Sequence, residues 1–174
     1  LLRWLEKWLE IFLAIFRVTG YDIWKTGQKE GGFMDLPGAQ ERIYTWEDIY
    51  ALPNGERAEL MDGRIYYMSP PSWTHQRISM ELSNQIASYI KKNQGDCQVL
   101  AAPFAVFLNE DPMNYLEPDI SVICDISKLD EKGCHGAPDW VIEIVSPSSR
   151  PRDYIKKMMR YCTAGVREYW IVDP

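Results

Sequence analysis

The stretch Trp140–Ser149, WVIEIVSPSS, decides the expected architecture because it looks like a buried strand with a carboxylate in its middle. Alternate residues of a strand share a face, so Glu143 is expected beside Val141 and Val145. The opposite face carries only apolar side chains, which are Trp140, Ile142 and Ile144. Two apolar faces are typical of a central strand. A buried, ionised carboxylate is costly unless a cation or hydrogen bonds compensate it, so Glu143 is the first candidate functional residue.

A second acid stands in a similar setting. In EPDISVI, Asp119 follows a proline at the start of an apolar strand and is expected to share a face with Ser121 and Ile123. Two carboxylates at strand ends of one sheet can approach a common point, where they would repel each other and attract a divalent cation. Magnesium takes one or two carboxylates, keeps several waters and accepts phosphate oxygens.

The composition is that of one soluble globular domain, since 46 % of the 174 residues are apolar and 25 % are charged. The net charge of −6 argues against nucleic-acid binding through an overall basic surface, although five of the 19 basic residues lie within Arg150–Arg160. Four scattered cysteines without a C-x-x-C pair and only two histidines leave almost no ligand set for a structural zinc site. We therefore expect reduced thiols in a cytoplasmic protein.

Residues 1–18, LLRWLEKWLEIFLAIFRV, are predicted to form an amphipathic helix because their charges fall on one narrow arc. Those charges argue against a transmembrane span, and no cleavage site of a signal peptide follows. Three interpretations stay open: packing on the domain or a partner subunit, contact with a membrane surface, or an artefact of expression or upstream translation. Residues 1–40 are treated as an appendage of a domain that covers residues 41–174.

The first elements of that domain are a short helix and a hairpin. Thr45 is expected to cap a helix over residues 46–51. Two strands, at residues 57–61 and 64–68, flank Asp62-Gly63, which is a strong hairpin turn and places Glu59 opposite Tyr66.

The remaining elements predict an α/β domain with a mixed central sheet flanked by helices. Their order is helix, three strands, helix, strand, with expected ranges 73–92, 97–108, 118–124, 140–145, 152–164 and 167–172. The final strand runs to the end of the sequence, so further strands are expected beyond Pro174.

The order of these motifs resembles a known nuclease group. An acid after proline, then an acid on an apolar strand, then a basic helix resembles the PD-(D/E)XK superfamily. The segments ELMDGRIYYMSPPSWTHQ, LEPDISVICD, GAPDWVIEIVSPSSRPRD and AGVREYWIVDP are similar, more closely, to the Uma-two-type endonuclease family, formerly a domain of unknown function. The resemblance implies a restriction-endonuclease-like core, αβββαβ, and metal-dependent cleavage of DNA.

The resemblance also implies the site residues. Asp119, Glu143 and the backbone carbonyl of Ile144 would bind Mg²⁺ or Mn²⁺, and Glu59 matches the family's upstream acid. The lysine of the superfamily, expected two residues after the second acid, is Val145 here, which implies that its role has moved to Lys157. That lysine would orient or activate the attacking water and offset charge in the transition state.

The run Asp153, Lys157, Tyr161 has spacings of four and would share one helix face. Lys156 is the alternative site lysine, and His75 and Tyr161 are accessory candidates. His75 would act as a general acid or phosphate contact, or else only cap or pack its helix. Phosphates beside the cleaved bond would be contacted by a basic group, which is Arg150, Arg152, Lys156 and Arg160.

Plainer interpretations remain for each residue. Glu143 and Lys157 could form a buried salt bridge with only a structural role. Asp119 could be an ordinary residue at the entry to a strand, and Glu59 could lie on a solvated face. The basic run Arg150–Arg160 could be a solvated face of its helix. The function expected from the whole sequence is a Mg²⁺-dependent endodeoxyribonuclease, plausibly a homodimer. The alternatives are an inactive nuclease-fold module that binds DNA or protein, and a protein recruited to a membrane or partner through its N-terminal helix.

Overall fold

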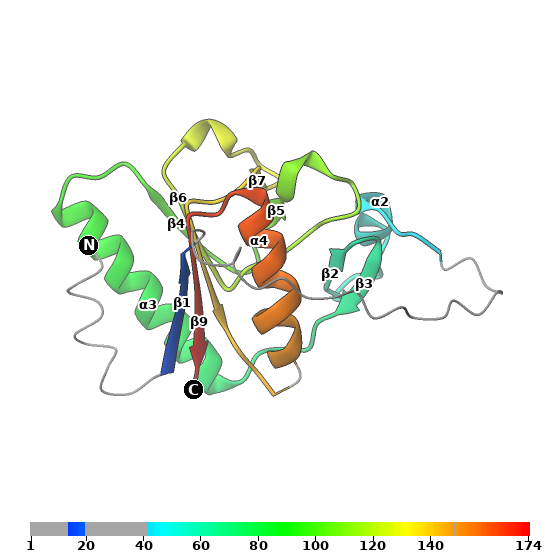
Figure 1. Cartoon of the computed structure of the whole chain (residues 1–174), viewed down its shortest axis with the longest axis horizontal. Coiled ribbons are helices and arrows are strands. Elements are labelled where there is room, and N and C mark those ends of the chain that lie inside the picture. Colours follow the sequence, from blue (N-terminus) through cyan, green and yellow to red (C-terminus); the bar gives the residue numbers. More distant parts are fainter. Residues whose placement is uncertain (1–13, 20–41, 148) are drawn as a thin grey trace, which may run out of the picture.

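The computed structural model describes residues 14–19, 42–147 and 149–174 (Figure 1). The strands are β1 (Ala14–Thr19), β2 (Ala58–Met61), β3 (Arg64–Tyr67), β4 (Gln98–Ala101), β5 (Val106–Phe107), β6 (Ile120–Ile123), β7 (Cys134–His135), β8 (Trp140–Ile144) and β9 (Glu168–Asp173). The helices are α2 (Trp46–Tyr50), α3 (Trp73–Lys92), α4 (Met158–Ala164), a π-helical segment η4 (Arg152–Lys157) and two 3₁₀ turns, η2 (Leu108–Glu110) and η3 (Ile126–Lys128).

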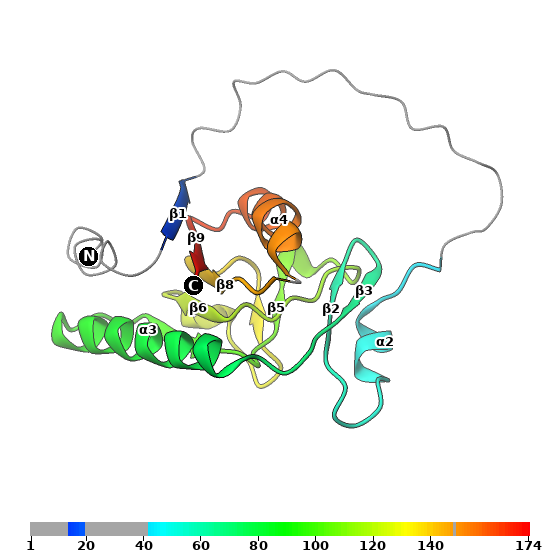
Figure 2. The same ribbon diagram turned by 90° about the horizontal axis from the view of Figure 1, so that it is seen from below.

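Five strands form the central sheet, in the order β1-β9-β8-β6-β4. The pair β8 and β9 is parallel and the other neighbours are antiparallel, so the sheet is mixed, as predicted. Helices α3 and α4 lie on opposite sides of this sheet, which Figures 1 and 2 show from two directions. The domain is therefore a mixed α/β fold with a helix on each face of the sheet.

Strand β8 separates two cores, and its side chains alternate between them as the sequence predicts. Its residues Trp140, Ile142 and Ile144 pack with Ile78, Leu82 and Ile86 of α3. Val141 and the following Val145 belong to the other core, which includes Tyr161 of α4 and Tyr169 of β9. Glu143 is buried within the same strand and alternates with the α3-side residues, so it faces the α4 side.

The hairpin β2-β3 has the predicted register, with Glu59 paired to Tyr66. Its turn residues Asp62 and Gly63 have φ of 52° and 71°, the left-handed values that a two-residue hairpin turn requires. A Cβ on Gly63 would lie 2.5 Å from Ile43 Cγ2, which favours glycine further. Leu60 exchanges backbone hydrogen bonds with Tyr115, and this joins the hairpin to the segment that leads into β6.

The predicted N-terminal helix is wrong where the structure describes it. Residues 14–19 form strand β1, which pairs antiparallel with β9 along its whole length. The segment AIFRVT is rich in β-branched and aromatic residues, and the edge of β9 offers unpaired backbone groups. Tertiary pairing therefore overrides the helical periodicity. The rest of that predicted helix, residues 1–13, lies outside the described residues.

Two further predicted elements differ from the structure. The strand expected over residues 97–108 is divided into β4 and β5, with Pro103 between them, because proline cannot donate a ladder hydrogen bond. The helix expected over residues 152–164 begins with the π-helical segment η4 before it continues as α4. Such segments are rare and often occur at functional sites.

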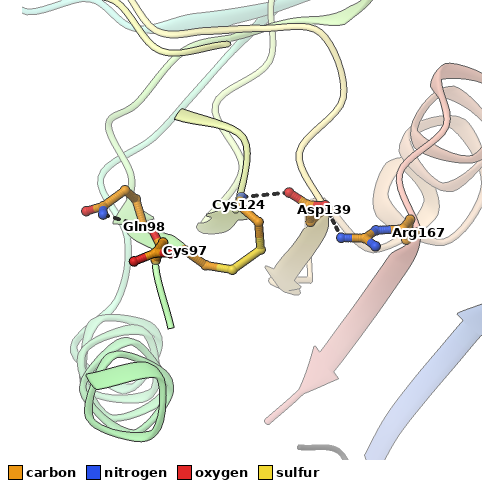
Figure 3. Close-up of a disulfide and its surroundings, with 6 residues drawn as sticks. Cys97, Gln98, Cys124, Asp139 and Arg167 are labelled. Atoms are coloured by element: carbon orange, nitrogen blue, oxygen red, sulfur yellow. Dashed lines mark hydrogen bonds and ion pairs between the residues drawn. A yellow bond between two sulfur atoms is a disulfide. The ribbon is translucent and has the colours of Figure 1, made fainter. Parts of the chain in front are cut away.

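The expectation of reduced thiols is wrong for one cysteine pair. Cys97 precedes β4 and Cys124 follows β6, and the adjacent residues Gln98 and Ile123 are paired across the sheet. The two cysteines form a disulfide at this edge (Figure 3). Asp139 accepts a 2.7 Å hydrogen bond from the Cys124 amide and forms an ion pair with Arg167. Cys134 and Cys162 are free thiols.

None of the helices within the described ranges has the length and apolar character needed to cross a membrane.

Candidate active site

Glu143 lies in a buried ionic group on the α4 side of the sheet. Its Oε1 accepts a 2.9 Å hydrogen bond from Lys157 Nζ and a 3.0 Å hydrogen bond from the Tyr161 hydroxyl. Burial raises the pKa of Glu143 well above its usual value, against the opposing effect of Lys157. The negative charge of Asp119 raises that pKa further. The strand that carries Glu143 therefore holds a carboxylate that is expensive to ionise.

Lys157 is the centre of this group and is itself only 4 % exposed. Its Nζ lies 2.8 Å from Glu59 Oε1, 2.9 Å from Glu143 Oε1 and 3.7 Å from Asp153 Oδ1. We call these four residues the Lys157 cluster. Burial opposes the charged amine, but the three carboxylates more than offset it and raise the pKa of Lys157. The lysine is therefore protonated and shared among three acids.

Glu59 reaches the cluster from the hairpin. Its Oε1 also accepts a 3.1 Å hydrogen bond from the Glu117 amide, in the segment that leads to β6. Its Oε2 is buried and has no hydrogen-bond partner among the described residues, and the same holds for Asp153 Oδ1. Buried acceptors without donors are costly and are expected where a ligand or water completes a site.

Segment η4 brings its own acid into the cluster. Asp153 and Lys157 are buried there, and Tyr161 is buried in the following turn of α4. Burial raises the pKa values of Asp153 and Tyr161. The Tyr169 hydroxyl donates a 2.8 Å hydrogen bond to the Asp153 carbonyl, which ties η4 to β9.

Asp119 is held separately, just before β6. Its Oδ2 accepts a 2.7 Å hydrogen bond from the Ile144 amide of the neighbouring strand β8. His75 Nε2 lies 3.1 Å from the same oxygen. The hydrogen bond to Asp119 raises the pKa of His75, against the effect of burial. His75 thus contacts a predicted site acid, while its backbone amide donates to Ser72 Oγ, the cap of α3.

The four predicted phosphate contacts have different surroundings. Arg150 forms a 2.6 Å ion pair with Asp173, and Arg160 forms an ion pair with Asp62. Lys156 donates a 2.8 Å hydrogen bond to the Tyr66 hydroxyl, and Arg152 lies over the Tyr66 ring. The two adjacent lysines thus differ in exposure, because the side chain of Lys157 is buried and that of Lys156 is exposed.

The sequence placed Asp153 on the same helix face as Lys157 and Tyr161 but gave it no role in the site, and the contact between His75 and Asp119 was not predicted. The Asp153 spacing of four from Lys157 was visible, and a buried lysine needs more than one acid, so that signal was available. The approach of α3 to β6 has no local signature. His75 and Asp119 are 44 residues apart in the sequence, so no local pattern predicts their contact.

The donor set that the sequence predicts for a divalent cation is two carboxylates and one carbonyl. Among the described residues, no group of three or more His, Cys, Asp or Glu side chains is arranged to hold a metal ion. Asp119 and Glu143 act on each other electrostatically, and the Ile144 amide that binds Asp119 belongs to the residue whose carbonyl is the third predicted ligand. Two carboxylates suit magnesium, which keeps several waters, so these residues fit such an ion.

Comparison with known proteins gives a consistent result. The model of the Uma2 family, described as "Putative restriction endonuclease", matches residues 46–174. The slr1290 protein of Synechocystis sp. is 30 % identical over 121 residues, which are 70 % of this chain and 60 % of that relative. The chain thus spans less than two thirds of that relative's length.

A crystal structure from Anabaena variabilis, described as "a putative nuclease belonging to DUF820", is also similar. Its TM-score is 0.61 at 25 % sequence identity, and the match covers 75 % of this chain and 74 % of that one. The family match covers the hairpin, both sheet faces and every residue of the Lys157 cluster. This chain therefore belongs to the Uma2 family of restriction-endonuclease-like proteins.

Proposed function

We propose that this protein is a metal-dependent endonuclease that hydrolyses DNA phosphodiester bonds with a restriction-endonuclease-like core. The nuclease descriptions of the family and of the similar crystal structure support this class of activity. The observation that carries the proposal is the Lys157 cluster, where three acids surround one buried cation close to Asp119. Such a concentration of buried charge is unfavourable for folding alone and is typical of a catalytic site.

Asp119, Glu143 and the Ile144 carbonyl would hold Mg²⁺ or Mn²⁺, with Glu59 as a supporting acid. When bound, such an ion supplies Lewis-acid chemistry, because it polarises the phosphodiester and lowers the pKa of water. The Ile144 amide fixes the orientation of Asp119 before any ion arrives. The mutual repulsion of Asp119 and Glu143 makes a divalent cation favourable between them.

Lys157 would act as a donor rather than as a base. Hydrolysis would form a bond between a water oxygen and phosphorus and break the bond between phosphorus and the departing sugar oxygen. The water would release one proton to solvent, the sugar oxygen would take one up, and negative charge would build up on the phosphoryl oxygens. A lysine with a raised pKa cannot accept the water's proton at neutral pH. Its Nζ can orient the water and offset the developing charge. Tyr161 holds Glu143 in place through its hydroxyl.

His75 would position Asp119 through their shared hydrogen bond. The basic group of Arg150, Arg152, Lys156 and Arg160 would contact phosphates on either side of the cleaved bond. A homodimer that acts on DNA is the assembly we propose for this activity.

The decisive experiment is cleavage of plasmid and single-stranded DNA in Mg²⁺ or Mn²⁺ by the wild type and by Glu143→Gln. EDTA-treated samples and Lys92→Gln, an exposed residue at the far end of α3, serve as controls. Metal-dependent cutting that is lost only in Glu143→Gln supports the proposal. Equal cutting by the wild type and Glu143→Gln contradicts the assignment of Glu143.

The second candidate is an inactive nuclease-fold module that binds DNA or protein. The observation in its favour is that Glu143 Oε1 already accepts two hydrogen bonds inside a paired ionic cluster. A wild type that binds no Mn²⁺ in calorimetry and cuts neither DNA would leave this candidate ahead.

A further inference from the structure

Three residues at the surface form a compact group of one aromatic ring and two cations. The Tyr66 hydroxyl accepts a 2.8 Å hydrogen bond from Lys156 Nζ, which lies 5.2 Å from the ring centroid. The Arg152 guanidinium lies 5.3 Å from the same centroid. Both distances are within the range of cation–π attraction. We call Tyr66, Arg152 and Lys156 the Tyr66 cluster.

The cations of this cluster differ from Arg150 and Arg160 in how they meet acidic side chains, since Arg152 acts on Asp153 only electrostatically. Arg150 and Arg160, on the same segment, are paired with Asp173 and Asp62. Within the described ranges, neither Arg152 nor Lys156 forms an ion pair with a carboxylate. Arg152 Nε is buried and has no hydrogen-bond partner there. The two positive charges are thus held in place and left available to an anion.

Each residue of the Tyr66 cluster is a backbone neighbour of a residue of the Lys157 cluster. Tyr66 is the cross-strand partner of Glu59, Arg152 precedes Asp153, and Lys156 precedes Lys157. Each surface residue is thus fixed by the backbone beside a buried residue of the candidate site. An anion bound at the surface here would be a close neighbour of the buried acids.

We infer that the Tyr66 cluster is a preformed phosphate subsite, which seats one or two backbone phosphates of the nucleic acid beside the buried carboxylates. This inference rests on the proposed function and assigns two roles within it. Arg152 and Lys156 bind phosphate directly. Tyr66 is a positioning residue that holds both cations.

The physical reason is preorganisation. Lysine and arginine side chains lose much rotamer freedom when they bind an anion, and contact with the Tyr66 ring removes part of that freedom beforehand. The contact leaves donors free, because lysine has three and arginine five. Arg152 and Lys156 can then form charge-assisted hydrogen bonds to phosphate without breaking an internal ion pair. Arg150 and Arg160 would first have to break theirs.

The test is binding of a fluorescein-labelled DNA duplex, measured by anisotropy in EDTA over a series of salt concentrations. Arg152→Gln and Lys156→Gln should each weaken binding about tenfold and reduce the slope of log K against log salt by about 0.9. Lys92→Gln removes the same charge at the far end of α3, roughly 25 Å along the helix from His75. It should leave the slope unchanged.

Tyr66 is tested with two variants. Tyr66→Phe keeps the ring and removes the acceptor for Lys156, so binding should weaken by roughly threefold. Tyr66→Leu removes the ring too and should approach the loss seen for Arg152→Gln. Thermal melting of both variants measures any structural role separately from the salt slope.

The inference is overturned if Arg152→Gln and Lys156→Gln behave like Lys92→Gln, or if the wild type does not bind the duplex. A Tyr66→Leu variant that melts earlier but keeps the wild-type slope and affinity would assign Tyr66 to hairpin packing alone. Because binding is measured without metal, this assay tests the phosphate subsite separately from the proposed nuclease activity. Normal binding without cleavage contradicts the nuclease, whereas normal cleavage with unaffected binding in the variants contradicts only the subsite.

Discussion

The two faces of the central sheet carry opposite kinds of core. The α3 face has an apolar core, where side chains of α3 meet those of β6, β8 and β9, and its buried polar residue on α3 is the uncharged Ser79. The α4 face has an equally buried apolar core but also encloses Glu143, Asp153 and Lys157. Strand β8 contributes to both faces within five residues. The α4 face thus combines an apolar core with buried charged groups, whose burial costs free energy unless they are paired.

The difference teaches where function is to be sought. Apolar side chains stabilise a core by about 0.8 kcal/mol for each buried CH₂ group. Replacing a buried ion cluster by apolar residues is often neutral or stabilising, so retaining the cluster is weak support for a role in stability. Buried positions usually carry apolar side chains, and an exception confined to one face of a sheet indicates a functional site on that face.

The largest effect is expected for Lys157→Met. The change leaves three buried carboxylates without their shared cation, and we expect the free energy of unfolding to fall by about 3–5 kcal/mol. Urea denaturation at neutral pH measures it. Lys156→Met is the matched control, because this neighbouring lysine is exposed and should cost less than about 1 kcal/mol. Equal stability of both variants would remove the contrast between the faces.

On the opposite face, Ile86→Ala should cost about 2–5 kcal/mol, because Ile86 is 1 % exposed and lies in the α3 core. The comparison predicts that DNA cleavage by this variant, assayed below its melting transition, matches the wild type for each folded molecule. Loss of cleavage in the folded variant would show that the α3 face also supports the site directly.

Tyr161→Phe tests the contact between the apolar core of the α4 face and the buried charges that this face encloses. The variant keeps the buried ring and deletes the hydroxyl that donates to Glu143, and we expect a loss of about 1.5–3 kcal/mol in the free energy of unfolding. Tyr67→Phe, at a side chain that is 63 % exposed, should stay within about 0.5 kcal/mol. A Tyr161→Phe protein as stable as this control would mean that the hydroxyl bond contributes nothing.

The last prediction concerns the pH dependence of stability. Burial, helped by nearby acids, raises the folded-state pKa of Glu143 above its ordinary value of 4.5, although Lys157 opposes the shift. The unfolded chain therefore releases this proton at lower pH than the folded protein does, so stability decreases as pH rises from about 4.5 through the folded-state pKa. The slope reaches at most about 1.4 kcal/mol per pH unit for one group.

Glu143→Gln removes this slope. The difference in unfolding free energy between variant and wild type should shift in favour of the variant as pH rises from about 4.5 toward neutrality. Urea denaturation over that range measures it. Parallel stability curves would contradict a raised pKa for Glu143.

Several features were predictable because they depend on neighbouring residues. The alternation of β8 around Glu143, the register of Glu59 and Tyr66 and the extent of α3 all follow from strand period, turn chemistry and helix period. The placement of Asp153, Lys157 and Tyr161 on one buried face followed from spacing in the same way, although η4 is π-helical rather than α-helical.

The failures have a common cause. Residues 14–19 have a helical pattern yet pair with β9, and Cys97 is joined to Cys124 because β4 and β6 are neighbours. Both outcomes depend on which strands are adjacent. Local sequence does not encode that information strongly, because edge pairing and cross-strand distance are set by the whole sheet.

The sequence alone determined which side chains must be buried and which acids are out of place among them, because burial patterns are periodic and local. Only the tertiary structure decided that Lys157 is shared by Glu59, Glu143 and Asp153, that His75 contacts Asp119, and that Tyr66 contacts both Arg152 and Lys156. These contacts join segments that are distant in the chain. Their geometry depends on how the hairpin, the sheet and η4 pack together, and the charges interact only once that packing excludes water.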